Sequence, residues 1–312
     1  MRVFLAGATG AIGRQLVPRL IAAGHEVTGT TRSPQRATEL DATGAKGVVL
    51  DALDRKAVHD AVAAAEPEAV IHQLTALPQR IDPRKIERDF LLNDRLRSEG
   101  TEILVAAAQA AGASRILAQS ISFFYAPGPP GTLHVESDPL LTAEQAPAMM
   151  KRSTAAVETL ERTVLGAGGL ILRYGYFYGP GTAIARDGSM GQDLAKRRMP
   201  VIGGGTGVWS LIHIADAAEA TVAALEHGLS GAYNIVDDRP AKVAEWLPAL
   251  AGAVGAPKPM RVPAWLARPL AGEYGLATMT AAQGASNAKA KAELGWTPAH
   301  PDWREGFRTA LG

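Results

Sequence analysis

Three glycines at fixed spacing near the start of the chain constrain its fold more than any other feature. Gly7, Gly10 and Gly13 follow an apolar run, Arg2–Ala6, and open a helical pattern over residues 11–23. In such a turn the first glycine permits a tight bend, the second lets the backbone approach a pyrophosphate, and the third lets the helix pack on the strand. A purely structural turn is the alternative. The strand–turn–helix context favours a dinucleotide site, with contacts from Gly7, Thr9, Gly10, Ala11, Ile12 and Gly13.

Strand and helix patterns alternate through the first half of the chain. Strands are predicted at Arg2–Ala6, Glu26–Thr31, residues 47–50, Ala69–His72, residues 115–120 and Leu170–Tyr174. Helices are predicted at residues 11–23, from Pro34 onward, and at residues 54–65, 83–112 and 148–165. Strands separated by such helices form right-handed βαβ units and a parallel sheet that is covered on both faces. The sequence therefore predicts an α/β fold with a Rossmann-type doubly wound parallel sheet.

The alternation stops after Tyr174, which indicates a second unit. Strand-like segments at residues 211–214 and 232–236 flank an alanine-rich helical pattern at residues 216–227, and the rest is rich in proline. We predict a cofactor-binding domain over residues 1–173 and a smaller α/β C-terminal substrate domain over residues 174–312. Residues 205–235 are expected to return to the first domain, so that the two are partly interleaved.

The end of the second predicted strand distinguishes between the two nicotinamide cofactors. An acidic residue there would accept a hydrogen bond from the ribose hydroxyl of NAD, whereas an arginine would accommodate the additional phosphate of NADP. The chain has no acid at this place and instead carries Thr31, Arg32 and Ser33. A solvated arginine that caps the next helix is the alternative. We predict that the protein prefers NADP(H) to NAD(H).

Two further strand ends are expected to border the same cofactor. Asp51, with Ala52 beside it, follows the third strand and could accept a hydrogen bond from the adenine amino group. A loop or helix-capping carboxylate is the alternative for Asp51. Small residues after the fourth strand would admit the nicotinamide ribose, and they are Leu74, Thr75 and Ala76.

Composition narrows the classes of function. The 312 residues include 32 Lys and Arg against 31 Asp and Glu, so the net charge of +1 gives no support for binding to nucleic acid. The absence of cysteine excludes disulfides and thiolate metal sites, and no His, Asp or Glu cluster has the spacing of metal ligands. The N-terminal apolar run is too short for a secretion signal, and no stretch is long enough to span a membrane. We expect a cytoplasmic protein with a small-molecule substrate and no metal.

Several ordered motifs resemble those of one enzyme family. Beside the glycine turn, they lie at residues 51–54, 70–76, 173–181, 212–216 and 286–298. Together they are similar to the extended short-chain dehydrogenase/reductases of the NAD-dependent epimerase/dehydratase group. The resemblance implies a Rossmann-type domain with a smaller substrate domain. It also implies that the helices at 83–112 and 148–165 could pair two copies into a homodimer.

The chain departs from that family at its acid–base pair. The family uses Tyr-x-x-x-Lys on the helix after the fifth strand, where the ammonium lowers the phenol pKa and binds the nicotinamide ribose. Alignment on Glu158 places Met150 at the tyrosine position and Thr154 at the lysine position. Lys151 lies one residue away, which turns it by about 100° around the helix. The usual proton donor is therefore predicted to be absent, and Thr154 could contact the ribose.

Other residues could take over parts of the site. The resemblance assigns substrate contact to Ser120 at the end of the fifth strand, and Tyr125 resembles a substrate-pocket tyrosine. Tyr176 and Tyr178 alternate, so they share a face of an extended segment, and Tyr178 could supply a substitute phenol. A structural aromatic pair is the alternative. We predict catalytic roles for Ser120, Tyr125 and Tyr178, and substrate contacts for Ser122, Met150, Tyr176 and His213, although His213 could instead orient the start of a helix.

Three functions compete at this point. The first is an NAD(P)-dependent oxidoreductase of atypical type that uses NADPH to reduce a small-molecule carbonyl or activated double bond by hydride transfer. The second is a non-catalytic NADP(H)-binding sensor or scaffold, which the loss of the Tyr/Lys pair favours. The third is a sugar-nucleotide epimerase or dehydratase, which would be expected to keep that pair and to use NAD.

Overall fold

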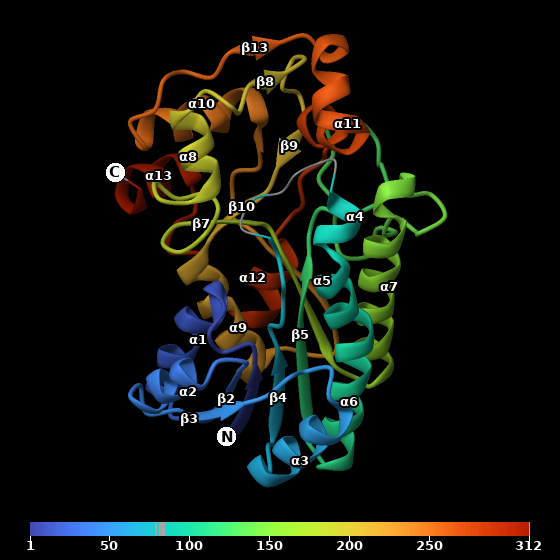
Figure 1. The fold of residues 1–312 in the computed structure, drawn as a ribbon, viewed down its shortest axis with the longest axis vertical. Helices are drawn as coiled ribbons and strands as arrows, with labels where there is room; N and C mark the ends of the chain where they lie inside the picture. The colour runs from blue at the N-terminus through green and yellow to red at the C-terminus, as the bar shows by residue number, and fades with distance from the viewer. Residues whose placement is uncertain (79, 81–84, 312) are drawn as a thin grey trace.

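A seven-stranded parallel sheet forms the centre of the molecule in the computed structural model, which describes residues 1–78, 80 and 85–311 (Figure 1). The strand order is β11-β6-β5-β4-β1-β2-β3, and every neighbouring pair is parallel. The strands are β1 (Arg2–Ala6), β2 (Glu26–Thr31), β3 (Lys46–Val49), β4 (Ala69–His72), β5 (Arg115–Ile121), β6 (Leu170–Tyr174) and β11 (Gly231–Ile235). The predicted Rossmann-type doubly wound sheet is confirmed. Its order reverses between β1 and β4, which is where ligands bind in such sheets.

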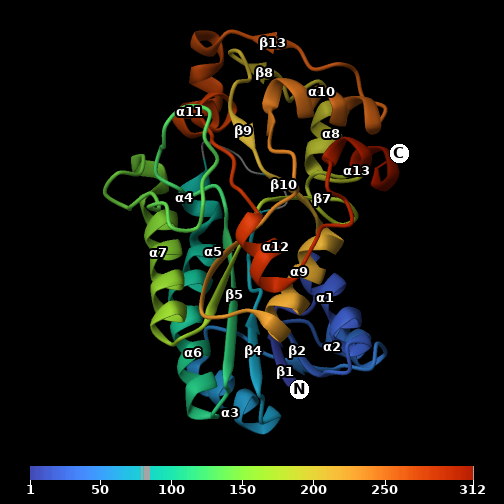
Figure 2. The ribbon, with the colours of Figure 1, turned by 180° about the vertical axis from the view of Figure 1, so that it is seen from behind.

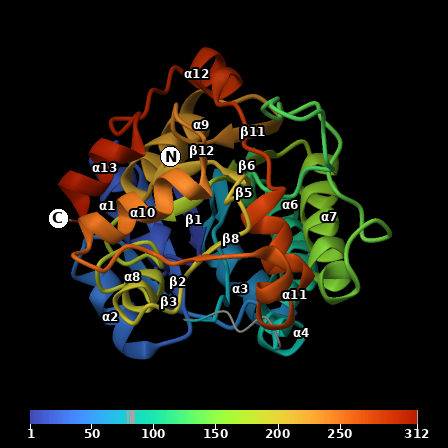
Figure 3. The same cartoon turned by 90° about the horizontal axis from the view of Figure 1, so that it is seen from above.

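Helices cover both faces of this sheet, as the views in Figures 2 and 3 show. One face packs against α1, α9 and α12 in a shared apolar core, and the other packs against α3, α6 and α7 in a second core. Those helices are α1 (Ala11–Ala22), α9 (Ile214–His227), α12 (Ala288–Leu294), α3 (Arg55–Ala65), α6 (Thr101–Ala110) and α7 (Lys151–Gly166). The predicted stripe of α1, with Ile12, Leu16 and Leu20, is buried. None of the helices in the described part of the chain is both long and apolar enough to cross a membrane.

Local sequence signals explain where several helices begin. Helix α2 (Pro34–Asp41) starts with proline, and Ser33 caps it by accepting a hydrogen bond from the Arg36 amide at 3.4 Å. Asp54 caps α3 through the Ala57 amide at 3.0 Å. The predicted elements of the first half agree with the structure to within about a residue at their ends, apart from the helices predicted at 83–112 and 148–165.

The helix predicted at residues 83–112 is wrong as a single element. Residues 83 and 84 lie outside the described residues, and the rest forms α4 (Ile86–Asp89), α5 (Leu91–Arg95), a π-helical turn (Leu96–Gly100) and α6. A π turn accommodates an extra residue, which the continuous helical pattern of the sequence does not reveal. The predicted helix at 148–165 likewise begins with a separate 3-10 turn (Ala148–Met150) before α7.

The C-terminal part caps the carboxyl ends of the strands and has an apolar core of its own. Helix α9 begins at Ile214 rather than at residue 216, because the strand before it ends at His213. The remaining elements are β7 (Tyr176–Tyr178), α8 (Ser189–Ala195), β8 (Val201–Ile202), β9 (Val208–Trp209), β10 (Leu211–His213), β12 (Ala241–Lys242), α10 (Val243–Ala253), β13 (Arg261–Val262), α11 (Ala264–Thr280) and α13 (Trp303–Ala310). Strand β11 returns to the central sheet and pairs with β6.

Candidate active site

The glycine turn joins β1 to α1 at the point where the strand order reverses. Gly7 has a φ of +92°, and a Cβ there would lie 2.7 Å from the Gln73 carbonyl oxygen. A Cβ on Gly13 would lie 2.4 Å from the Gly7 oxygen and 2.5 Å from the Ala8 oxygen. Only glycine fits these two places. Gly10 has more space, since the nearest atom to a Cβ there is the Gly7 oxygen at 3.3 Å.

The turn leaves backbone donors open at the start of α1. Gly10 is the N-cap and has no side chain to satisfy the amides of the first turn. The Thr9 hydroxyl donates to Thr31 Oγ1 at 3.1 Å, which ties the turn to the end of β2. Ile12 is buried in the core, so only its backbone faces the turn. This arrangement can hold a pyrophosphate through amides and the helix dipole.

Arg14 is a site residue that the sequence reasoning missed. Its Nη1 donates to the Thr9 carbonyl oxygen at 3.3 Å. Its Nη2 lies 3.1 Å from where a Cβ on Gly181 would be, in the loop after β7. The arginine therefore lies between the glycine turn and a loop of the C-terminal part. Its position on the first turn of α1 is a signal that the sequence does carry.

The end of β2 presents one free cation. Arg32 is exposed, and the hydrogen bonds and ion pairs of the described residues do not include its side chain. Thr31 and Ser33 are engaged locally, because Thr31 Oγ1 accepts from the Ser33 amide at 3.3 Å and Ser33 caps α2. Arg32 can therefore turn toward a phosphate without breaking a contact.

The segments after β3 and β4 lie along the same edge of the sheet. Asp51 is exposed, and its Oδ1 accepts a hydrogen bond from the Leu53 amide at 3.0 Å, which leaves its second oxygen open. The Ala76 amide donates to Asn93 Oδ1 at 3.2 Å. The chain beyond β4 is thus held against α5, with partly exposed or exposed side chains at Ala52, Leu74, Thr75 and Ala76.

Ser120 and Tyr125 belong to a buried polar network. The Ser120 hydroxyl donates to Glu161 Oε1 at 2.6 Å, and Arg173 forms a two-pronged ion pair with Glu161, with nitrogen–oxygen distances of 2.7 and 3.0 Å. Arg173 also donates to the Tyr125 hydroxyl at 2.8 Å, which itself donates to Asn234 Oδ1 at 2.8 Å. Both predicted catalytic hydroxyls therefore have protein partners.

The tyrosines near the site are poor acids at neutral pH. Burial raises the pKa of Tyr125, and the neighbouring Arg173 only partly offsets this effect. Burial also raises the pKa of Tyr176 and of Tyr178. A phenol exchanges protons efficiently when its pKa is near the operating pH, and none of these three side chains is moved in that direction.

Tyr176 and Tyr178, which alternate in β7, both pack in the apolar core of the C-terminal part, with different neighbours. Tyr176 is partly exposed and stacks between Phe123 and Trp209, with ring centroids 4.2 and 3.8 Å apart. Tyr178 is fully buried in the C-terminal core, edge-on to Phe307 at 5.2 Å. The structure therefore places Tyr176 on an aromatic wall and Tyr178 inside the core, which agrees with the alternative of a structural aromatic pair. Ser122 is buried at the end of β5, where its amide donates to the Tyr174 oxygen at 2.9 Å.

Met150 and Thr154, at the start of α7, are both buried. Met150 packs in an apolar cluster with Phe124, and Thr154 is almost completely buried with a hydroxyl that has no partner. Lys151 is exposed. The inner face of this helix thus offers a thioether and one free hydroxyl.

His213 caps a helix and approaches two other possible metal ligands. Its Nδ1 accepts a hydrogen bond from the Ala215 amide at 3.3 Å. Ligand atoms of His213, Asp216 and His300 lie within 4.8 Å of one another. Asp216 Oδ2 already accepts from the His300 amide at 2.8 Å, and the two imidazole rings are tilted by only 31° with centroids 3.9 Å apart. We interpret His213, Asp216 and His300 as a structural cluster that holds the segment around His300 against the start of α9. The sequence could not reveal it because His300 is distant along the chain.

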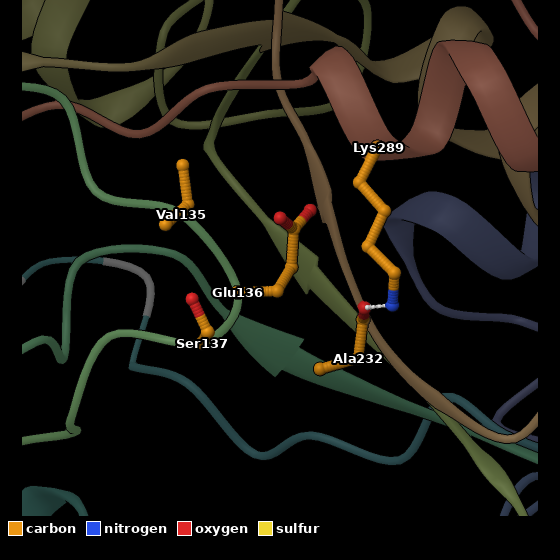
Figure 4. Close-up of a pocket in the computed structure, with 5 residues that line it drawn as sticks. All are labelled: Val135, Glu136, Ser137, Ala232 and Lys289. Carbon is orange, nitrogen blue, oxygen red and sulfur yellow. Dashed lines mark hydrogen bonds between the residues drawn. The ribbon is translucent and has the colours of Figure 1, made fainter.

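A cavity of about 320 Å³ lies at the β11 edge of the sheet, away from the glycine turn (Figure 4). Both charged side chains that line it form hydrogen bonds within the protein. Lys289 donates to the Ala232 oxygen at 2.8 Å, and Glu136 Oε1 accepts from the Asn234 amide at 2.7 Å. None of the predicted site residues lines it. The lining residues are Val135, Glu136, Ser137, Ala232 and Lys289.

Comparison with known proteins places this geometry among related enzymes. A sequence model described as the NAD-dependent epimerase/dehydratase family matches residues 3–236. A Streptomyces protein named 3-diazoavenalumate denitrifying reductase is 47% identical over 310 residues, which cover 98% of this chain and 99% of that protein. A Stigmatella aurantiaca protein named 4-hydroxy-2-methyl-3-oxo-4-farnesyl-3,4-dihydroquinoline-1-oxide ketoreductase is 25% identical over 249 residues, 79% of this chain and 71% of that one. The UDP-glucose 4-epimerase of Thermus thermophilus, solved with NAD, aligns with a TM-score of 0.75 and 25% identity over 99% of this chain and 97% of the other.

Proposed function

Because this chain belongs to the NAD-dependent epimerase/dehydratase family, we propose that it is an NADPH-dependent oxidoreductase that replaces the diazonium group of an aromatic substrate by hydrogen. The observation that carries the proposal is the 47% identity, over almost the whole of both chains, to a denitrifying reductase of a diazo compound. The proposal keeps the hydride transfer expected from the sequence but replaces the expected carbonyl or double-bond substrate by an aryldiazonium ion.

The residues at the β1–β4 reversal fit a nicotinamide dinucleotide. The turn from Gly7 to Gly13 would hold the pyrophosphate on its open amides, with Arg14 beside it. Arg32 would bind the additional phosphate of NADP, and Asp51 would accept a hydrogen bond from the adenine amino group. Thr154 has a buried hydroxyl without a partner, which is available to the nicotinamide ribose. In this proposal residues 1–173 hold the cofactor, residues 174–312 the substrate, and residues 205–235 return to the first unit.

The reaction needs no proton donor, which agrees with the residues present. NADPH supplies a hydride when bound, so that an aryldiazonium ion becomes an arene and dinitrogen: a C–H bond forms, the C–N bond breaks, and its electron pair leaves with the nitrogen. Met150 carries no proton to give, and burial raises the pKa of Tyr125 and Tyr178. A site built for carbonyl reduction would need an acid at this place.

The chain's own contribution is then to bind, orient and keep water away. Phe124 and Met150 form a buried apolar cluster beside the start of α7, and Tyr176 and Phe123 present a stacked aromatic wall. An aromatic ring packs favourably on such surfaces. Exclusion of water protects a diazonium ion from hydrolysis. Ser120 and Tyr125 act in this proposal as supports of the β5 end, since Glu161, Arg173 and Asn234 hold their hydroxyls.

The test is a labelled turnover. The purified protein is mixed with a diazotised aminohydroxycinnamate and NADPH that carries deuterium at its transferable position. We expect NADPH oxidation, release of dinitrogen, and deuterium on the ring carbon that carried nitrogen. The same reaction in deuterated water with unlabelled NADPH should leave that carbon unlabelled. Label from the solvent, or no turnover of any diazonium compound, would contradict the proposal.

Carbonyl reduction is the second candidate, and the similarity to a ketoreductase favours it. A panel of aromatic ketones with NADPH separates the two functions, because the diazonium reductase should leave them unchanged. The double variant Met150→Tyr with Thr154→Lys restores the family's acid–base residues and should create or raise ketone reduction. Ketone turnover by the unaltered protein, faster than diazonium turnover, would favour this candidate.

A further inference from the structure

Arg97 is a buried cation whose guanidinium has no hydrogen-bond or ion-pair partner among the described residues. It lies on the π-helical turn Leu96–Gly100, and only 6% of its surface is exposed. Its Nε is buried and has no hydrogen-bond acceptor, and none of the hydrogen bonds and ion pairs within residues 1–78, 80 and 85–311 includes its guanidinium. The nearby carboxylate of Asp94 interacts with Arg97 through its charge but forms no hydrogen bond with it. Its Oδ2 receives Arg152 Nε at 2.9 Å and the Ser153 hydroxyl at 3.0 Å, and its buried Oδ1 has no hydrogen-bond partner among the described residues.

Such a group costs stability. Burial of an unpaired charge is strongly unfavourable because the guanidinium loses its hydration. Burial lowers the pKa of Arg97, and the charge of Asp94 offsets this only in part. A buried arginine of this kind is explained if an anion joins it when the protein works.

The backbone of the π turn is fixed beside the end of β4. Thr101 donates to the Arg97 carbonyl oxygen at 2.6 Å, and its hydroxyl also contacts His72 Nε2 at 2.9 Å. His72 is the last residue of β4 and precedes the segment proposed to border the nicotinamide. The arginine is therefore anchored next to the cofactor edge rather than at the rim of the molecule. π turns occur frequently at functional sites.

The side chain of Arg97 lies near one tyrosine of the C-terminal part, Tyr274. It lies in electrostatic reach of Tyr274 on α11, which in turn lies in reach of Tyr176. Tyr274 also packs on the apolar cluster that contains Met150 and Phe124. Figures 1 and 2 show α11 above α4 and α5, so the C-terminal part covers this place. Arg97 thus lies between the end of β4 and Tyr274, which packs against the apolar cluster of Met150 and Phe124.

We propose that Arg97 binds the carboxylate of an aromatic carboxylic acid, so that the substrate is an aryldiazonium ion with an acidic side chain. The substrate assignment rests on the proposed function, whereas the carboxylate site does not. A guanidinium binds a carboxylate through two parallel hydrogen bonds. It also repels a diazonium group, so the acidic end would face Arg97 and the cationic end the cofactor edge. The cofactor phosphates are served by the glycine turn, Arg14 and Arg32.

The direct test is binding of an unreactive pair of compounds. Isothermal titration of the NADP⁺-loaded protein compares trans-cinnamate with methyl trans-cinnamate, in the unaltered chain and in Arg97→Met, Arg97→Lys and Arg95→Met. The matched control Arg95 is an exposed residue that pairs with Glu99 at 2.8 Å. We expect Arg97→Met to weaken cinnamate binding roughly 10- to 100-fold, to leave the ester unchanged, and to resist urea at least as well as the parent. Arg97→Lys should retain part of the preference, and Arg95→Met all of it.

Other outcomes overturn the proposal. Equal affinity for acid and ester in the unaltered chain would exclude a carboxylate site. Loss of stability in Arg97→Met without a change in the acid–ester preference would show a structural role. Inorganic phosphate that competes more strongly than cinnamate would indicate a phosphate-bearing ligand instead.

Turnover separates this inference from the proposed function. If no diazonium compound is reduced but the acid preference depends on Arg97, the reaction is wrong and the carboxylate site stands. If the diazotised cinnamate and its methyl ester are reduced with the same kcat/KM in both the parent and Arg97→Met, the reaction stands and the carboxylate site is wrong.

Discussion

The two ends of the candidate site differ in whether their polar groups have partners within the protein. At the glycine turn, Gly10 leaves the first amides of α1 uncapped and Arg32 has no protein partner within the described chain. At the ends of β5 and β6, the polar groups bind one another, as Glu161 and Arg173 do. The first region is open to a ligand, and the second is a closed network. A polar residue at an expected position is available for chemistry only if the fold leaves it without a partner.

The largest expected effect comes from opening the closed network. Glu161→Ala should lower the free energy of unfolding by about 3–5 kcal/mol, because it leaves the buried Arg173 charge uncompensated. Urea unfolding measures this change. The control Glu99→Ala removes an exposed ion pair with Arg95 and should cost less than about 1 kcal/mol. Similar losses in both variants would mean that the buried Glu161–Arg173 pair contributes no more to stability than an exposed ion pair.

The buried carboxyl group of Asp237, which has one oxygen without a partner, should destabilise the fold when it is ionised, whereas the ionised Glu161 stabilises it. Burial raises the pKa of Asp237 to about 8, with Asp302, Asp238 and Asp216 adding to the rise, and its Oδ2 has no partner. The folded protein therefore retains a proton that the unfolded chain loses near pH 4. This contribution to stability is complete below about pH 4 and is lost as the pH rises toward 8, at roughly 1.4 kcal/mol per pH unit.

Asp237→Asn keeps the neutral form at every pH. We expect the variant to be more stable than the parent at neutral pH, with a difference that shrinks as the pH falls toward 4. Urea unfolding across that range gives both slopes. An identical pH dependence in parent and variant would show that Asp237 is already ionised in the fold.

The glycine turn can be broken by a single methyl group. Gly13→Ala would place a Cβ 2.4 Å from the Gly7 oxygen, so we expect a loss of about 1–3 kcal/mol in unfolding free energy and weaker NADPH binding. Urea unfolding and a fluorescence titration with NADPH report the two effects. Gly166→Ala is the matched control at the end of α7, where nothing lies within 4 Å, and it should stabilise by up to about 1 kcal/mol. Normal NADPH binding by Gly13→Ala would show that the helix can shift away from the strand.

Sequence reasoning succeeded where the signal is local. The strand before the turn, its glycines and the stripe of α1 are encoded within a few residues, so the sheet and its turn were predictable. The state of Ser120 was not, because its partner Glu161 lies 41 residues later on another element. Arg97 was missed for the same reason: no pattern of neighbours shows that a residue lacks a partner. The π turn that carries it packs against α7, an element about 50 residues later, and the local sequence does not reveal such a contact.

The smallest expected effect tests the open region alone. Arg32→Ala should weaken NADPH binding roughly tenfold, or about 1.4 kcal/mol, and leave NADH binding unchanged, because the arginine would meet only the additional phosphate. A fluorescence titration with each cofactor measures both affinities. Arg36→Ala is the control, since Arg36 is an exposed arginine on the first turn of α2, the helix that follows Arg32. If both variants lose NADPH affinity equally, general positive charge rather than Arg32 selects the cofactor. If the unaltered protein binds NADH more tightly than NADPH, Arg32 does not select the cofactor. An arginine without a partner at the end of β2 would then not by itself predict its ligand.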